Sequence, residues 1–227
     1  MKKIILDLCG GTGAWSQPYA EKGYDVRVLT LPLDIRVMLF PGPVHGILAA
    51  PPCTMFSRAA TRVWPRSEAQ MREALSIVDA CLRLVVCCKP KWWVLENPIG
   101  TLKKYLGEPI YKFDPYEFGD PYTKRTWLWG DFAPPFKFVC ANKIEVNRHE
   151  NIKSKDGLSR VAVRAITPLG FARAFFKANP LAAGSVPSGW FATAPTSRPR
   201  GAPWRTASTA GESLIRSRTR SKTKSHS

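Results

Sequence analysis

Short apolar runs alternate with helical patterns over the first 180 residues, and no other feature constrains the fold as strongly. The runs are continuously apolar rather than alternating, as expected for strands that are buried on both faces. They comprise residues 3–8, 25–31, 45–52 and 91–98. Helical patterns occupy residues 14–22 and the segment from Ser67 onward. This order of elements predicts an α/β fold with a doubly wound, mostly parallel sheet.

The longer predicted helix has a clear start and one apolar face. Ser67 is a good N-cap, and Gln70 stands where it completes a capping box. Helical spacing then predicts a buried face. Its members are Met71, Ala74, Leu75, Val78, Leu82, Val85 and Val86. We expect Cys81, Cys87 and Cys88 to be buried on or near this face as small apolar side chains.

Composition divides the chain near Pro180. Residues 181–227 are rich in Ser, Thr, Pro, Ala and Arg, which predicts a disordered basic tail after a single domain at 1–180. The chain has 34 Lys and Arg against 17 Asp and Glu, a formal net charge of +17. Eight of the basic residues and one acid fall in the tail, so the domain keeps 26 against 16, or +10. Nucleic acid is therefore the expected partner.

The cysteines and the N-terminus indicate a soluble, cytoplasmic protein. Six cysteines without a Cys-x-x-Cys spacing or a secretory signal favour neither a disulfide framework nor a zinc site. The first apolar run is interrupted by Asp7, and no stretch approaches the roughly 20 apolar residues that span a bilayer. We therefore expect reduced cysteines, no metal and no membrane.

Three reactive side chains fall at or just beyond the carboxyl ends of predicted strands, namely Asp7, Cys53 and Glu96. In open α/β sheets these ends meet at one edge, where ligands bind. Pro51 and Pro52 end their strand, so Cys53 is expected at the rim, where a thiol can be reached. Glu96 stands in an apolar run, where burial raises the pKa of a carboxyl group and suits it to donate a proton.

Each of these features also has a plainer interpretation. A turn with Gly10, Gly11 and Gly13 is often only a tight connection, and a free cysteine is often a small buried side chain. His45 and His149 are expected to be solvated or structural, because no nucleophile-elbow motif accompanies them.

Four motifs taken together resemble the DNA (cytosine-5) methyltransferases, and the compact chain is most similar to their small phage-encoded members. "DLCGGTGAW", "APPCTMFS", "LENP" and "FGDPYTKRTWLWG" follow the order and approximate spacing of that family's patterns. "VRAITPLGFARAFFKANP" is similar to a later family segment, so the resemblance covers about residues 3–180. It implies a Rossmann-like methyltransferase fold, S-adenosylmethionine as methyl donor and DNA as substrate.

The resemblance also implies a mechanism. Cys53 would add to carbon 6 of the target cytosine and so activate carbon 5 toward the methyl group, a form of covalent catalysis. Glu96 would engage ring nitrogen 3 and the exocyclic amine, and Lys124 or Arg125 would be the basic residue that supports the base. The base has to leave the duplex to reach such a site.

Binding residues follow from the same resemblance. Asp34, in "LDIR", suits a carboxylate that receives the adenine amine of the donor. The implied donor-binding residues are Asp7, Cys9, Gly10, Gly11, Gly13, Asp34 and Pro51; the implied nucleic-acid-binding residues are Ser57, Asn97, Lys124 and Arg125.

The chain departs from the family at several points. Cys9 and Ala14 stand where the family has Phe and Gly, and the second strand ends without an acid for the ribose hydroxyls. Residues 133–162 are too few for a full-size target-recognition domain, so recognition is short or belongs to the tail or to a separate specificity partner. Two alternatives stay open. One is a methyltransferase-like nucleic-acid-binding protein with weak or no activity, and the other is a cytosine-5 methyltransferase that acts on RNA.

Overall fold

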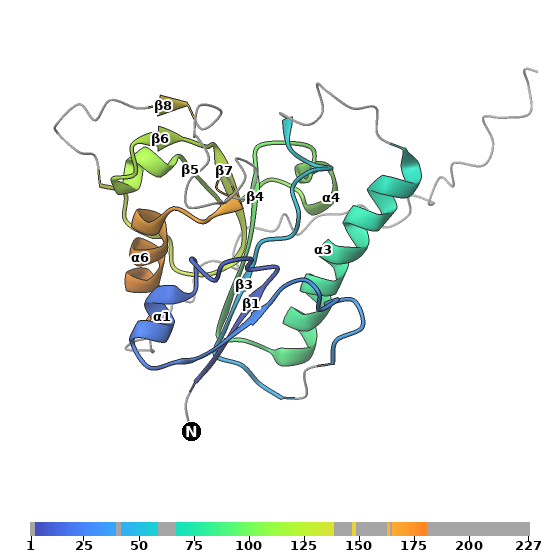
Figure 1. The fold of residues 1–227 in the computed structure, drawn as a ribbon, viewed down its shortest axis with the longest axis horizontal. Helices are drawn as coiled ribbons and strands as arrows, with labels where there is room; N and C mark the ends of the chain where they lie inside the picture. The colour runs from blue at the N-terminus through green and yellow to red at the C-terminus, as the bar shows by residue number, and fades with distance from the viewer. Residues whose placement is uncertain are drawn as a thin grey trace, which may run out of the picture. The chain divides into compact units, whose positions relative to one another are not determined.

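The computed structural model describes residues 3–39, 42–58, 67–138, 147–148, 163 and 165–180 (Figure 1). His149 and the predicted disordered tail at 181–227 lie outside the described residues.

A six-stranded mixed sheet lies at the centre of the fold. Its order in space is β2-β1-β3-β4-β7-β5. The strands are β1 (Ile4–Leu8), β2 (Asp25–Leu29), β3 (Gly46–Ala49), β4 (Trp92–Pro98), β5 (Tyr111–Phe113) and β7 (Thr126–Asp131). Neighbours among the first four are parallel, whereas β7 is antiparallel to both β4 and β5. A separate pair joins β6 (Tyr122–Thr123) to β8 (Asn147–Arg148).

Helices cover both faces of the sheet, which confirms the predicted doubly wound, mostly parallel α/β architecture. One face is covered by α3 (Glu68–Cys88) and the other by α1 (Gln17–Glu21) and α6 (Leu169–Ala178) (Figure 1). The short elements α4 (Lys103–Leu106) and η1 (Pro115–Phe118) flank β5 along the chain. Within the described residues no helix combines the length and the apolar character needed to cross a membrane.

Alternate residues of each strand build two separate cores. Leu6 and Leu8 of β1 belong to the core beneath α3, whereas Ile5 belongs to the aromatic core beneath α1 and α6. In that second core Phe171 and Phe175 of α6 pack against Trp15, with ring centroids 5.7 and 5.6 Å apart. Both faces of the sheet are therefore buried, as the continuous apolar runs predict.

Helix α3 begins at the predicted residue, but its buried face is rotated about the helix axis relative to the predicted buried face. Ser67 and Gln70 form the capping box. Cys81 and Cys88 are buried, whereas Val86 is 72% exposed and Cys87 is exposed, so the prediction that Val86 and Cys87 are buried is wrong. The buried stripe runs through Cys88, and Val86 lies about 200° around the axis from it.

Local contacts also shorten the first helix. A helix over 14–22 was expected, but α1 begins at Gln17, and the hydroxyl of Ser16 before it donates to Asp7 rather than capping the helix. His45 is buried, with its ring 6.3 Å from that of Trp92, which confirms a structural role.

Candidate active site

Asp7 is a fully buried carboxylate at the carboxyl end of β1. Ser16 Oγ donates a hydrogen bond to Asp7 Oδ2 at 2.5 Å, whereas the buried Oδ1 has no hydrogen-bond partner among the described residues. Burial raises the pKa of Asp7 to about 6, against the opposing effect of the Ser16 hydrogen bond. A buried acceptor of this kind is poised for a cationic or N–H ligand group.

The glycine turn closes directly over this carboxylate. The Gly13 N–H donates to the Gly10 carbonyl at 2.9 Å. A β-carbon at Gly10 would lie 2.3 Å from the carboxyl carbon of Asp7, so only glycine allows the approach. Gly11 and Gly13 have φ values of 56° and 72°, in the left-handed region that favours glycine. The predicted turn is confirmed, and its backbone and Asp7 form one unit.

We predict that Asp7→Asn stabilises the fold at neutral and alkaline pH. The folded pKa of about 6 lies above the ordinary 3.8, so ionisation of Asp7 costs up to about 3 kcal/mol of stability. The cost is absent below the unfolded pKa, grows as the pH rises through the folded pKa and is complete above it. Urea unfolding of Asp7→Asn should therefore show a gain near pH 8 that vanishes near pH 4. Asp131→Asn, at an exposed acid, is the matched control; a gain of equal size at both pH values would contradict the prediction.

Cys53 lies in a short loop just beyond β3. The Cys53 carbonyl accepts hydrogen bonds from the N–H groups of Phe56 and Ser57, at 2.9 and 2.8 Å, which closes the loop into a tight turn. The residue is half-buried, as expected for a position at the rim of the sheet. Its thiol is therefore carried on a defined turn and is not part of either core.

Glu96 lies inside β4 rather than after it. Its side chain is 15% exposed, and Glu96 Oε1 is 3.9 Å from Lys124 Nζ, whose side chain is 12% exposed. Burial raises the pKa of Glu96, and the positive charge of Lys124 opposes that rise. Lys124 reaches this place because β7 is antiparallel to β4, so the residues before β7 return to the carboxyl edge.

Strand register places Asp7 and Glu96 on the same face of the sheet. Asp7 is level with Leu48, and Leu48 is level with Val94. Glu96 lies two residues beyond Val94, so its side chain points to the same side. Strand spacing and rise put the Cα atoms of Asp7 and Glu96 about 12 Å apart. Ala50 lies between them on this face. A small residue therefore separates two buried carboxyl groups.

Asn97 ties the strand of Glu96 to the loop of Cys53. It is fully buried, and Asn97 Nδ2 donates to the Pro51 carbonyl at 3.0 Å. Two further contacts join the same segments: Ser57 bridges to Gly100, and the Thr101 N–H donates to the Phe56 carbonyl at 2.8 Å. The contact found for Asn97 is thus within the protein, two residues from Cys53.

We expect Asn97→Ala to change the reactivity of Cys53. The substitution leaves the Pro51 carbonyl without this donor, which costs about 1–3 kcal/mol and releases one end of the loop. The rate of Cys53 alkylation by iodoacetamide, read by peptide mass spectrometry, should change at least about threefold while the fold persists. Thr101→Val is the control, because the Thr101 N–H still satisfies the Phe56 carbonyl at the other end of the loop. Equal alkylation rates in Asn97→Ala and wild type would contradict this role.

Asp34 lies in the segment after β2, where Arg36 already binds it. The two side chains form an ion pair at 2.7 Å, and Arg36 also pairs with Glu73 of α3. Hydrogen bonds from Arg36 hold the pKa of Asp34 at about 2. Arg83 of α3 donates to the carbonyls of Ile35, Arg36 and Met38 and fixes this segment. A donor amine at Asp34 would therefore share its carboxylate with Arg36.

The remaining predicted site residues also lie near the carboxyl ends of the parallel strands, and they differ in how far they are exposed to solvent. Pro51 is buried and accepts from Asn97, and Ser57 is half-buried. Arg125 is exposed, and its carbonyl accepts from the Ile99 N–H at 2.9 Å. Lys124, rather than Arg125, is the cation beside Glu96. The sequence analysis did not identify Ser16 as a site residue. A serine two residues before Pro18 at the start of a helix is typical of an N-cap, and nothing in the sequence indicates that it binds Asp7.

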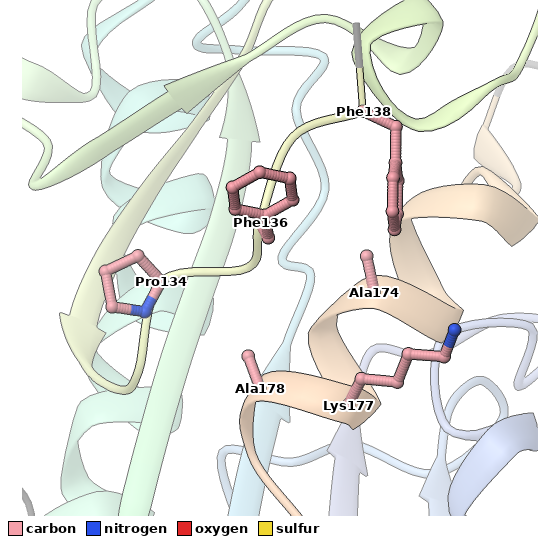
Figure 2. A pocket seen from close by; sticks show the side chains of 6 residues that line it. All are labelled: Pro134, Phe136, Phe138, Ala174, Lys177 and Ala178. Carbon is pink, nitrogen blue, oxygen red and sulfur yellow. The ribbon is translucent and has the colours of Figure 1, made fainter. Parts of the chain in front are cut away.

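A pocket of about 270 Å³ lies elsewhere, beside α6 (Figure 2). It is lined by Pro134, Phe136, Phe138, Ala174, Lys177 and Ala178. None of these residues belongs to the edge that carries Asp7, Cys53 and Glu96. Among the described residues no group of three His, Cys, Asp or Glu side chains is arranged to hold a metal ion.

The chain is similar to solved methyltransferase structures at low sequence identity. No protein-family model matches the chain, and no curated protein matches it in sequence. One similar solved structure is described as a DNA modification methyltransferase encoded within an E. coli prophage, with 16% identity, a TM-score of 0.40 and coverage of 57% of this chain and 47% of that one. A methyltransferase of Entamoeba histolytica has 11% identity, a TM-score of 0.38 and coverage of 65% and 57%. The chain thus spans about half the length of each structure.

Proposed function

We propose that this protein transfers a methyl group from S-adenosylmethionine to carbon 5 of cytosine in DNA, through a covalent adduct with Cys53. The observation that carries the proposal is the link between two reactive groups. Asn97, next to Glu96 in β4, holds the loop of Cys53 through the Pro51 carbonyl. A displayed thiol and a buried carboxyl group held together in this way suit addition to a polarised ring, with a proton supplied at the opposite side.

Cys53, Glu96 and Lys124 have different roles in the proposed reaction. The Cys53 sulfur adds to carbon 6 of the cytosine while Glu96, whose pKa is raised by burial, gives a proton to ring nitrogen 3. After transfer, a water accepts the carbon 5 proton, the bond between carbon 6 and the Cys53 sulfur breaks to release the thiolate, and ring nitrogen 3 returns its proton to Glu96. Lys124 remains beside Glu96 as a fixed positive charge.

The edge at Asp7 fits the cationic part of the donor. The donor supplies an electrophilic methyl group when bound. Asp7 presents one buried, unpartnered carboxylate oxygen beneath the backbone of the Gly10–Gly13 turn. Pro51 and Cys9 border the same edge of the sheet, next to β3 and β1. In this proposal Asp7 is the carboxylate that receives the positive charge of the donor, whereas Asp34 is engaged by Arg36.

Product identification tests the proposal. Purified protein is incubated with methyl-labelled donor and either DNA or RNA, and the nucleic acid is then digested to nucleosides. We expect label in 5-methyldeoxycytidine from DNA. Label only in 5-methylcytidine from RNA would replace the substrate, and no label in either, with nucleic acid bound, would leave a binding protein.

We predict that the segment 181–227 adds affinity for DNA without taking part in the chemistry. A variant that ends at Pro180 loses eight positive charges. If some of these contact phosphates, the slope of log affinity against log salt becomes shallower by roughly 0.9 per lost contact. Fluorescence anisotropy over a salt series measures the slope, and turnover at saturating DNA should be unchanged. Loss of turnover at saturation would place part of this segment in the active site.

A further inference from the structure

Two phenylalanines that lie outside both cores line the pocket beside α6 (Figure 2). Phe136 is 78% exposed and Phe138 is 48% exposed. Their ring centroids lie 5.9 Å apart, at an interplanar angle of 79°. Removal of apolar rings from water is favourable, so two exposed rings at the wall of one pocket indicate a ligand with an apolar surface.

The segment that carries the two rings is held at both ends by hydrogen bonds. At one end the Ala133 N–H donates to Asn179 Oδ1 at 2.8 Å, and Asn179 Nδ2 donates to the Ala133 carbonyl at 2.9 Å. At the other end the Phe138 N–H donates to the Glu117 carbonyl at 2.7 Å. The pocket between this segment and the second half of α6 is therefore preformed, which lowers the cost of binding a ligand there.

Positive charges without acidic partners stand at the same pocket. Lys177 lines it, and Arg173 lies one helical turn earlier on the same stripe of α6. Both are exposed, and neither forms an ion pair with any residue that the structure describes. Helix α6 contains no acid, and Glu117 of η1 is paired with Lys137 at 3.0 Å. The pocket therefore combines exposed aromatic rings with uncompensated positive charge.

We propose that this pocket binds one unstacked base of a single-stranded nucleic acid. The base stacks on Phe136 and packs beside Phe138, while Arg173 and Lys177 contact the neighbouring phosphates. Aromatic rings that take any base, together with cations that follow the backbone, are the means by which proteins bind single strands. An apolar peptide would cover the rings but leave both cations without partners. The net charge of +10 over residues 1–180, from 26 Lys and Arg against 16 Asp and Glu, favours the same polyanion.

The pocket is separate from the edge that carries the proposed active site. Helix α6 begins beside Asp120, whose Oδ2 accepts a hydrogen bond from the Gly170 N–H at 3.1 Å. Lys177 lies seven residues further along α6, about 10 Å along the helix axis. The base in this pocket is therefore a second contact with nucleic acid, and its binding does not depend on methyl transfer.

Binding of the full-length chain to labelled oligothymidylate, oligouridylate and duplex DNA of the same length, measured by fluorescence anisotropy, tests the role of the rings. Phe136→Leu keeps an apolar side chain but removes the aromatic face. It should lower affinity for the single strands about five- to a hundredfold and leave affinity for the duplex unchanged, because a paired base cannot enter the pocket. Phe136→Tyr should bind as wild type does. Val86→Ala, at an exposed apolar residue of α3 on the other face of the sheet, is the control.

A salt series tests the role of the cations. Lys177→Met should make the slope of log affinity against log salt for oligothymidylate shallower by roughly 0.7, the value for one lost phosphate contact on a single strand. Phe136→Leu should lower affinity without changing this slope, because it removes no charge. Lys91→Met, at an exposed cation that precedes β4, should keep the wild-type slope.

Photochemical cross-linking locates the bound base. Oligothymidylate that contains 5-iodouracil, irradiated in complex with the wild-type chain, should become attached to the peptide of Phe136 and Phe138, as read by mass spectrometry. Equal single-strand affinities in Phe136→Leu and wild type would overturn the proposal, as would an equal loss on the duplex or attachment only at other peptides. Equal affinities with a change of molar mass in light scattering would make the pocket a contact between copies of this chain. No methyl donor is used, so these outcomes are independent of the proposed function.

Discussion

Cys53→Ser should reduce methyl transfer by at least about a thousandfold, because a serine hydroxyl is a far weaker nucleophile than a thiolate at the pH of the reaction. Donor binding should persist, since Asp7 belongs to β1 and the glycine turn follows it, whereas Cys53 lies in the loop after β3. Wild-type protein should also form a stable adduct with DNA that contains 5-fluorocytosine, because the fluorine blocks the last proton loss. Labelled-donor assays and denaturing gels measure the two effects.

Cys87→Ser is the matched control for this experiment. Cys87 is an exposed cysteine of α3, outside the site. The control should keep full transfer and full adduct formation. Undiminished turnover in Cys53→Ser would overturn covalent catalysis by this residue, whereas loss of turnover in both variants would point to a general effect on the fold.

Glu96→Gln should lower the rate of transfer by about 10²–10⁴-fold with little change in donor affinity, because a positioned proton donor stabilises only the transition state. Glutamine keeps the size of the side chain and removes only its ability to give up a proton. Glu21→Gln, at an exposed acid of α1, should have wild-type activity. A large loss of thermal stability in Glu96→Gln, parallel to the loss of rate, would instead make Glu96 structural.

The pH dependence gives Glu96 a signature of its own. Burial raises its pKa, so Glu96 stays protonated to higher pH than an exposed glutamate and transfer falls as the pH rises through that pKa. Lys124 lowers this pKa, so Lys124→Met should move the alkaline limb of the rate profile to higher pH. A shift to lower pH, or the same limb in Glu96→Gln, would contradict the assignment.

Much of the fold could be predicted from local patterns. The buried runs at β1, β3 and β4 have few polar residues, and such strands need helices on both faces. The capping box at Ser67 fixed the start of α3, because its hydrogen bonds are formed within four residues. The edge that carries Asp7, Cys53 and Glu96 also follows from the parallel order of the strands.

Other features depend on contacts that no local pattern contains. Strand β5 has three residues and little signal, and the antiparallel direction of β7 is set by its pairing with β4 and β5. The partner of Glu96 therefore had to be found in the structure: the resemblance named Lys124 or Arg125 as support for the target base, and the structure places Lys124 beside Glu96. The bond between Asn97 and Pro51 likewise joins residues 46 positions apart.

The small pairing of β6 with β8 has a consequence for protein engineering. β8 lies in the connection from β7 to α6, yet it joins the chain beside Thr123, the neighbour of Lys124, and not the six-stranded sheet. Phe138 lies earlier in the same connection. Its N–H donates a hydrogen bond to the carbonyl of Glu117 in η1, the short helix that follows β5. A segment engineered onto β8 would therefore lie next to Thr123 and Lys124, while β1, β3 and β4, which position Asp7, Cys53 and Glu96, stay unchanged.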